Sequence, residues 1–275
     1  MKQPITKASG QQEAFNSEKA LSSYKRAGAT EQLANRTLRA VRRDIGKSAD
    51  TNDIYSSGLH FLNEHAPAIA SRYSLKRAIM NLGPAGYIFE KFVARLLESE
   101  GYTTQVSQVL RGHCVAQEID IIATKGDQKI MVECKYHNRP GLKSDLKVAL
   151  YTQARFQDVQ ERGGFTEAWL VTNTHSTTEA GKYARCMGMK LIAWRYPYKG
   201  GLEKWIEDQR LYPITILPAL PANVLSAFAD AGIILVKDLA HFSVNDLVTL
   251  FHLKPKIAKH ILASAQTLNS AIARS

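Results

Sequence analysis

The stretch EIDIIATKGDQKIMVECKYH, residues 118–137, decides the fold because it reads as two strands joined by a tight turn. Its apolar residues, many of them β-branched, favour strands. Between the two apolar runs, Gly126 and Asp127 suit a two-residue hairpin turn. Such a turn makes Lys125 face Gln128 and fixes which residues face each other along the hairpin. The sequence therefore predicts an antiparallel β-hairpin with a defined register.

Three charged residues fall on one face of this predicted hairpin. The register puts Asp120 directly opposite Glu133, with their Cβ atoms on the order of 5 Å apart. Lys135, two residues after Glu133, points to the same face because strand side chains alternate. The opposite face receives the side chains that we expect in the core, namely Ile119, Ile121, Val132 and Cys134.

The facing carboxylates need compensation, since two like charges at this spacing repel each other. A cation between them would remove the repulsion, and hard divalent ions such as Mg²⁺ take oxygen ligands. A lysine beside such an ion could orient an attacking water or balance charge on a phosphate, as phosphodiester hydrolysis requires. The alternative is an exposed sheet face with unrelated surface charges, because a glutamate two residues before a lysine is common in strands.

The order of elements around the hairpin predicts an α/β domain. Before the hairpin, Gly83, Pro84 and Gly86 break the chain and begin this domain. The next helix should bury one face, which carries Phe89, Phe92, Val93, Leu96 and Leu97. Strands are expected at 103–110, 118–124, 129–137, 168–173 and 189–195, and helices at 143–162 and 176–188. This order predicts a sheet flanked by helices, with the last two strands parallel.

Two further polar residues interrupt the apolar faces of the flanking helices. Glu90 breaks the apolar pattern of IFEKF, and Gln153 does the same in ALYTQARF. Together with the charges of the hairpin, this ordered set resembles the restriction endonuclease-like superfamily, whose motif is written PD-(D/E)xK, and in particular its Mrr-type branch. The resemblance covers residues 84–196, although Ile119 stands where the family's usual proline precedes the first acidic residue.

The resemblance implies a fold, a set of site residues and an activity. The fold would be a central mixed sheet flanked by helices. Asp120 and Glu133 would bind Mg²⁺ or Mn²⁺, Lys135 would be catalytic, and Glu90 and Gln153 would play supporting polar roles in the catalytic site. The activity would be that of a metal-dependent endonuclease that hydrolyses double-stranded DNA, restriction-type and regulated by a nucleotide. Two alternatives are a structure-specific resolvase for branched DNA and a non-catalytic DNA-binding regulatory protein.

A zinc site is a rival interpretation of the same region, with His113, Cys114, Cys134 and His137 as ligands. It is disfavoured because Cys134 and His137 are three residues apart in a predicted strand and so face opposite sides. A nucleophilic Cys134 is also disfavoured, since we expect this side chain to be buried in apolar surroundings.

The N-terminal segment predicts a small β-hairpin, with a turn at Ser9-Gly10, followed by four helices. Helix caps are expected at Asn16 and at Thr51 or Asn52. The segments ITKASG, EAFNSEKALSSYKRAGA, TNDIY and SRYSLKRAIMNLG resemble the ATP-cone, a nucleotide-sensing domain, over residues 3–83.

This second resemblance implies ATP or dATP as a regulatory ligand. Lys7 and Lys19 would meet its phosphates, helped by the helix N-terminus near Asn16. Ala8 and Ser9 replace two residues of the family's Lys-Arg-Asp-Gly sequence. The alternative is therefore a scaffold or homodimerisation surface that binds no nucleotide.

After LYPITILP the sequence predicts a small module of short helices. Its stretch DLVTLFHLKPKIAKHILASAQTL resembles a helix-hairpin-helix element, whose second helix meets DNA phosphate at its N-terminus. Pro255 suits the first turn of that helix, and the cations that would contact DNA are Lys254, Lys256 and Lys259. Because His252-Leu253-Lys254 replaces the usual Gly-x-Gly hairpin, a plain helical packing module is the alternative.

The composition favours a polyanionic partner, and the length allows more than one domain. The chain has 275 residues and a formal net charge of +11. Its three scattered cysteines favour a reducing compartment. No apolar run reaches the roughly 18 residues of a membrane span, and the N-terminus lacks a hydrophobic signal core. We expect a soluble cytoplasmic protein with three domains, at residues 1–83, 84–212 and 213–275.

Overall fold

The computed structural model describes residues 4–6, 12–45, 49–83, 86–139, 141–217 and 220–273. The chain forms two compact units. The first comprises Met1–Lys76 and Gln266–Ser275, and the second comprises Arg77–Ala265. The limits of these units fall inside two helices, α4 (Pro67–Met80) and α11 (Pro255–Ala273). The division into three domains stays a prediction.

The first unit contains the predicted hairpin and helices. Strands β1 (Pro4–Thr6) and β2 (Gln12–Ala14) pair antiparallel, and the turn predicted at Ser9-Gly10 lies outside the described residues. Helices α1 (Ser17–Arg26), α2 (Glu31–Asp44) and α3 (Thr51–His65) follow. The Asn16 side chain accepts a hydrogen bond from Lys19 N at 2.9 Å, which confirms the predicted cap of α1.

The N-cap of α3 differs from the prediction. Asp50 occupies it, and its Oδ1 accepts hydrogen bonds from Asn52 N at 2.7 Å and Asp53 N at 2.8 Å. The Asp53 carboxylate in turn accepts one from Asp50 N at 2.9 Å. A cap at Thr51 or Asn52 was expected, but the reciprocal arrangement satisfies donors on both sides of the helix start, which favours Asp50.

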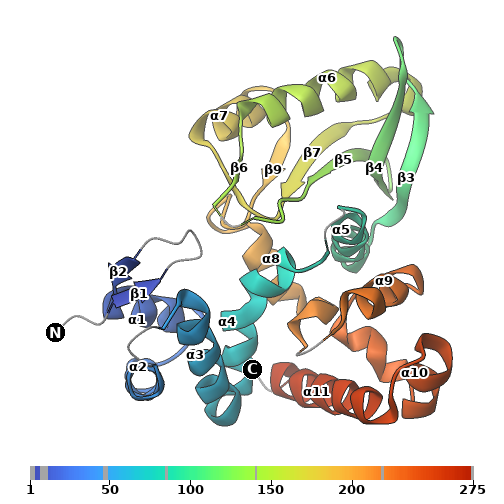
Figure 1. Cartoon of the computed structure of the whole chain (residues 1–275). Coiled ribbons are helices and arrows are strands. Elements are labelled where there is room, and N and C mark those ends of the chain that lie inside the picture. Colours follow the sequence, from blue (N-terminus) through green and yellow to red (C-terminus); the bar gives the residue numbers. More distant parts are fainter. Residues whose placement is uncertain are drawn as a thin grey trace. The chain divides into compact units, whose positions relative to one another are not determined.

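A five-stranded mixed sheet lies at the centre of the second unit (Figure 1). Its spatial order is β3-β4-β5-β7-β9. The strands are β3 (Thr103–Arg111), β4 (Ala116–Lys125), β5 (Gln128–Lys135), β7 (Glu167–Thr172) and β9 (Lys190–Ile192). The first three are antiparallel to one another, whereas β7 pairs parallel with both β5 and β9. This confirms the predicted fold class and the parallel pairing of the last two strands.

Helices cover both faces of this sheet. Helices α6 (Leu146–Gly163) and α7 (Thr178–Cys186) lie on one side of it, and α5 (Tyr87–Ser99) lies on the other (Figure 1). The predicted apolar stripe of α5 is completely buried, with 0% exposure at Phe89, Phe92, Val93, Leu96 and Leu97.

The second unit contains short elements that the sequence did not predict. Helix α8 (Leu202–Gln209) follows the sheet, and β6 (Lys143–Ser144) pairs parallel with β8 (His175–Ser176). A pair of two-residue strands is too short to carry a periodic sequence signal.

The predicted C-terminal helices belong largely to the second unit. They comprise α9 (Ala222–Asp230), η2 (Val236–His241), α10 (Val244–Phe251) and the start of α11, and the short η1 (Ile214–Ile216), which was not predicted, precedes them. η1 and η2 are 3₁₀-helices, the tighter form that is used in short pieces. Among the described residues, no helix is long and apolar enough to cross a membrane.

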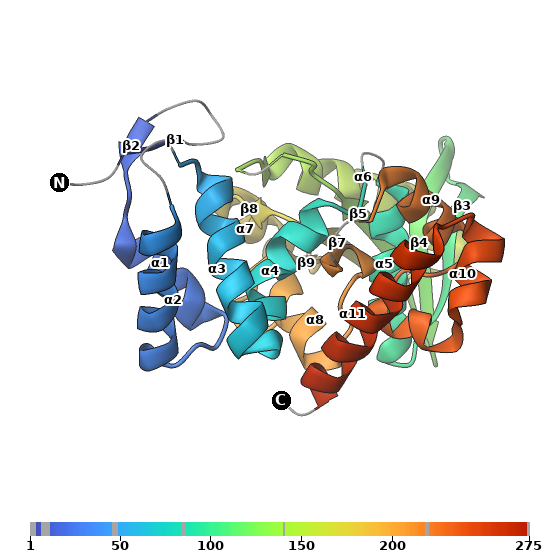
Figure 2. The ribbon, with the colours of Figure 1, turned by 60° about the horizontal axis from the view of Figure 1, so that its bottom comes forward.

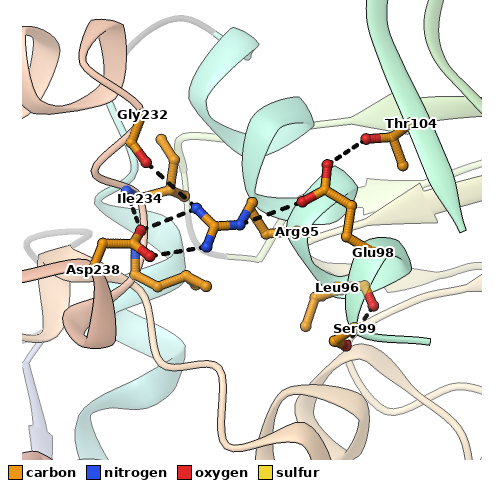
Figure 3. A network of polar contacts seen from close by, with 9 residues as sticks. Arg95, Leu96, Glu98, Ser99, Thr104, Gly232, Ile234 and Asp238 are labelled. Carbon is orange, nitrogen blue, oxygen red and sulfur yellow. Dashed lines mark hydrogen bonds and ion pairs between the residues drawn. The ribbon is translucent and has the colours of Figure 1, made fainter. Parts of the chain in front are cut away.

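Polar contacts join this helical module to α5. Figures 1 and 2 both show α9 beside α5, and Lys91 Nζ donates a hydrogen bond to Ala229 O at 3.0 Å. The Arg95 guanidinium donates two hydrogen bonds to the Asp238 carboxylate, at 2.9 and 3.1 Å (Figure 3). Helix α5 therefore connects the sheet to the helical module.

Candidate active site

The β4–β5 hairpin has the predicted register. Lys125 faces Gln128 across the turn, and the pairing continues to Ile121 opposite Val132. Gly126 adopts a left-handed φ of 55°, which glycine adopts without strain. The side chains expected in the core are buried, namely Ile119, Ile121, Val132 and Cys134.

The regular pairing ends just before the charged residues. Asp120 and Glu133 follow Ile121 and Val132 in the register but belong to no described ladder pair. Instead, Cys134 N donates a hydrogen bond to Asp120 Oδ2 at 2.7 Å. The Asp120 side chain thus takes the hydrogen bond that a strand carbonyl would accept, and this satisfies a buried N–H group. Asp120 and Glu133 therefore lie just beyond the last backbone pair of β4 and β5.

The β3 strand is also interrupted beside Asp120. Its ladder with β4 pairs Val106 with Ile121 and Gln108 with Ile119, and it skips the facing pair of Ser107 and Asp120. Ser107 has a φ of 53°, a left-handed conformation that is uncommon for a residue other than glycine. Asp120 therefore lies at a local break in the sheet, and such breaks occur often near functional sites.

Glu133 forms an ion pair with Arg155 of α6, an arginine that the sequence interpretation did not single out. Only 14% of the Glu133 side chain and 9% of the Arg155 side chain are exposed. The compensating cation beside Glu133 is thus a guanidinium supplied by the protein.

Glu90 joins the same group of carboxylates from α5. Burial is the main cause that raises its pKa to about 7, and repulsion by Asp120, Glu118 and Glu133 adds to the shift. A hydrogen bond with the Ser107 side chain partly opposes it. The structure therefore brings Glu90 together with both predicted ligands, and it adds the exposed Glu118, which was not predicted.

Burial also controls the proton affinity of the hairpin carboxylates. It raises the pKa of Asp120, opposed by the hydrogen bond from Cys134 N and by the charge of Arg155. It raises the pKa of Glu133 to about 7, with a further contribution from Asp120. Burial likewise raises the pKa of the Cys134 thiol well above its ordinary value, which disfavours a thiolate nucleophile.

The two remaining predicted residues lie on different elements. Lys135 is exposed at the end of β5, and it follows Glu133 on the same face by strand alternation. Gln153 lies on α6, two residues before Arg155, and is only 6% exposed. Its buried Oε1 accepts no hydrogen bond from any described residue.

Asn173, the residue after β7, forms hydrogen bonds with the backbone just beyond Lys135. Asn173 Oδ1 accepts a hydrogen bond from His137 N, and Asn173 Nδ2 donates one to His137 O, both at 2.8 Å. Asn173 is completely buried. This two-way contact fixes the backbone at the end of the strand that carries Glu133 and Lys135, a role that sequence reasoning missed.

The rival zinc ligands do not gather into one site among the described residues. His113 N and Cys114 N donate hydrogen bonds to the backbone and side chain of Asp158, at 2.7 and 2.6 Å. Cys134 is buried in the sheet. Among the described residues, no three His, Cys, Asp or Glu side chains gather closely enough to hold a metal by themselves.

The residues predicted for nucleotide and DNA lie outside this site. Lys19 is exposed on α1 of the first unit, and Lys7 lies outside the described residues. The predicted DNA contacts Lys254, Lys256 and Lys259 are all exposed at the start of α11. The preceding His252 has a left-handed φ of 53°, the conformation for which glycine is usual at a helix end.

Comparison with known proteins shows which family the central part of the chain resembles. Residues 85–195 match a family model described as restriction endonuclease. An uncharacterized protein of Archaeoglobus fulgidus is 42% identical over 174 residues, which span 63% of this chain and 98% of that protein. The crystal structure of a protein of unknown function is 40% identical with a TM-score of 0.62, covering 70% of this chain and 100% of that one.

The family match and the mixed sheet together define the class. Residues 85–195 form a restriction endonuclease-like domain, a class of nucleases that act on DNA and generally use divalent metals. The chain belongs to the same family as the Archaeoglobus fulgidus protein. The ATP-cone and helix-hairpin-helix interpretations stay predictions.

Proposed function

We propose that this protein is a Mg²⁺-dependent DNA endonuclease whose catalytic site contains Asp120, Glu133 and Lys135, with Glu90 and Gln153 in supporting roles. One observation carries the proposal: Asp120 and Glu133 directly follow the last described pair of the β4–β5 ladder, Ile121 opposite Val132, and their charges interact. The restriction endonuclease-like class of residues 85–195 supplies the reaction type, hydrolysis of a phosphodiester bond.

The two carboxylates fit a divalent ion such as Mg²⁺ or Mn²⁺. Each has one oxygen engaged, Asp120 with Cys134 N and Glu133 with Arg155, so each keeps a second oxygen for a ligand. Burial makes their negative charge costly, which favours a cation beside them. Mg²⁺ usually takes one or two protein carboxylates and completes its shell with water and substrate phosphate. Two carboxylates are therefore a sufficient donor set.

The protein's own residues divide the remaining work. A bound divalent ion supplies polarisation of the scissile phosphate and a water of lowered pKa. Lys135, the exposed cation on the same face, donates hydrogen bonds to a phosphate oxygen or to the attacking water. Glu90 supports the site from α5, and in the metal-free protein burial and the neighbouring carboxylates raise its pKa to about 7. The contacts of Asn173 keep the strand end in place.

Cleavage assays with plain, methylated and branched DNA, each with and without Mg²⁺, test this proposal. Asp120→Asn should reduce cleavage by orders of magnitude, whereas Asp127→Asn, at the exposed hairpin turn, should leave it unchanged. Lys135→Ala should keep the melting-temperature shift caused by Mg²⁺ and lose turnover. The proposal fails if Mg²⁺ leaves the melting temperature unchanged and Asp120→Asn cuts DNA at the normal rate. Exclusive cleavage of branched DNA would indicate the resolvase alternative.

A DNA-binding role for the C-terminal module belongs to the same proposal. Lys254 lies just before α11 and Lys256 and Lys259 lie in its first turns, shortly after the left-handed His252. This arrangement supports contact with DNA phosphates that is independent of sequence. The alternative, a plain helical packing module, predicts that the three lysines are dispensable for DNA affinity.

A nucleotide-sensing role for the N-terminal segment rests on its resemblance to the ATP-cone. The confirmed hairpin and the capped α1 helix support it, and Lys19 is exposed in the first turn of that helix. Calorimetry with ATP and dATP tests the role. Absence of heat at millimolar nucleotide would leave the scaffold alternative.

A further inference from the structure

Arg155 reaches into the candidate active site from the helix on the sheet's α6 side. It is 8% exposed, and its Nη1 donates to Glu133 Oε2. Its guanidinium carbon lies 5.3 Å from the centroid of the Tyr151 ring, one helical turn earlier. Tyr151 is 59% exposed, so the guanidinium lies between a buried carboxylate and a ring at the surface.

The hydrogen bonds of Arg155 are incomplete in this position. Its Nε is buried and has no hydrogen-bond partner among the described residues. A buried donor left without an acceptor costs free energy, and the planar guanidinium is suited to two parallel hydrogen bonds with a carboxylate. The guanidinium thus neutralises the charge of Glu133, but its buried Nε–H stays without an acceptor among the described residues.

We propose that Arg155 is a placeholder cation, which neutralises Glu133 in the metal-free protein and is displaced by electrostatic repulsion when a divalent ion binds the second oxygen of this carboxylate. This rests on the proposed function, because it takes Glu133 to be a metal ligand. A guanidinium and a divalent ion beside one carboxylate repel each other, so the ion pair lowers the affinity of the site for metal. Arg155 is therefore a positioning residue that sets how much metal the site needs.

The central test is a Mg²⁺ titration of the full chain without DNA, by calorimetry. Arg155→Met removes the charge but keeps a long apolar side chain, and it should bind Mg²⁺ at least tenfold more tightly than wild type. Arg155→Lys keeps the charge and should bind within about threefold of wild type. Arg162→Met, an exposed arginine on the same helix, is the matched control and should bind as wild type does.

The direction of the change separates this role from a merely structural one. Loss of a structural contact would weaken Mg²⁺ binding or leave it unchanged, and either result in a folded Arg155→Met protein overturns the proposal. If the wild type binds Mg²⁺ and cuts DNA while Arg155→Met binds no more tightly, only the placeholder role fails. If neither protein binds Mg²⁺, the metal-dependent function fails as well.

A second measurement uses the wild-type chain, in case Arg155→Met does not fold. Nitrogen NMR of the arginine side chains, with the Arg155 signal assigned from its absence in Arg155→Lys, reports directly on the ion pair. The Arg155 signal should move when Mg²⁺ is added, while the Arg162 signal should not. An Arg155 signal that stays unchanged at saturating Mg²⁺ contradicts its release from Glu133.

Discussion

At the residue scale, three half-buried carboxylates share one region of the sheet: Glu90, Asp120 and Glu133. Burial is the largest cause that raises the pKa of each, and repulsion by neighbouring carboxylates adds to it. Each therefore holds a proton more tightly in the folded chain than in the unfolded chain. Folding of the metal-free protein should be coupled to proton uptake.

This coupling predicts a stability that falls as the pH rises. Between the ordinary glutamate value of 4.5 and the folded value of about 7, the folded chain binds more protons than the unfolded chain. The free energy of unfolding should therefore decrease through this window. Glu90→Gln should remove part of the effect and stabilise the metal-free protein by about 1–2 kcal/mol at about pH 8, after allowance for solvent screening. Urea unfolding with a chelator, at several pH values, measures it.

Glu161→Gln is the control for this prediction, since Glu161 is an exposed glutamate on α6. It should leave the pH profile unchanged. If the free energy of unfolding of the wild type does not change with pH, or if Glu90→Gln and Glu161→Gln have the same pH profile, the buried carboxylates do not set the pH dependence.

The positions of these carboxylates could be predicted from the sequence, but their partner could not. The turn at Gly126-Asp127 and the alternation of strand side chains are local, so they predict the register as far as Ile121 opposite Val132, with Asp120 and Glu133 just beyond it. Arg155 lies on a separate helix, and its pairing depends on how α6 packs on the sheet. A charged residue in ALYTQARF is equally compatible with an exposed helix face.

At the element scale, Asp238 of η2 holds the helical module against α5. Its carboxylate accepts hydrogen bonds from Arg95 and from the backbone N–H groups of Ile234 and Leu235, the latter two at 3.0 and 2.8 Å (Figure 3). Arg95 also donates to Gly232 O. Only 14% of the Asp238 side chain is exposed. One carboxylate thus serves both the fold of the module and its attachment to the helix that carries Glu90.

Asp238→Ala should therefore destabilise the protein by about 2–4 kcal/mol, because it leaves Arg95 and two backbone donors without their acceptor. Asp208→Ala is the matched control. Asp208 pairs with Lys204 one turn away on α8, and both side chains are about half exposed, so its loss should cost less than about 0.5 kcal/mol. Chemical denaturation of both variants measures the difference. Equal midpoints would show that the Arg95–Asp238 contact contributes nothing to stability.

Sequence patterns predicted most elements and missed those whose existence depends on tertiary contacts. The helices with an apolar stripe, such as α5, carry their own periodic signal. The paired strands β6 and β8 have two residues each and form only because the chain after β5 meets the chain after β7. The break at Ser107 is likewise invisible in TTQVSQVL, which reads as a continuous strand.

At the scale of the whole molecule, the first compact unit combines residues from the two ends of the chain. The last residues, Gln266–Ser275, group with the N-terminal helices, whereas the rest of the helical module groups with the sheet. Deletion of residues 213–275 would remove Asp238 and leave Arg95 without this ion pair. Point variants are a cleaner test of the C-terminal module than truncation.

The formal net charge of +11 favours DNA binding by the whole surface, so the α11 lysines must be separated from this background. We expect Lys254→Gln, Lys256→Gln and Lys259→Gln together to weaken DNA binding and to lower the slope of log affinity against log salt by about 2–3, one counterion for each lost phosphate contact. A matched triple variant of the exposed lysines Lys182, Lys199 and Lys204 removes the same charge elsewhere.

Fluorescence anisotropy with a DNA duplex, across a salt titration and with Ca²⁺ in place of Mg²⁺, gives both slopes. The α11 variant should lose most of its affinity at low salt and approach the wild type's residual binding at high salt, because only its ionic contacts are gone. The control variant should lose much less. If both variants reduce the slope equally, the protein attracts DNA through its overall charge, and the start of α11 is a packing element without a DNA contact.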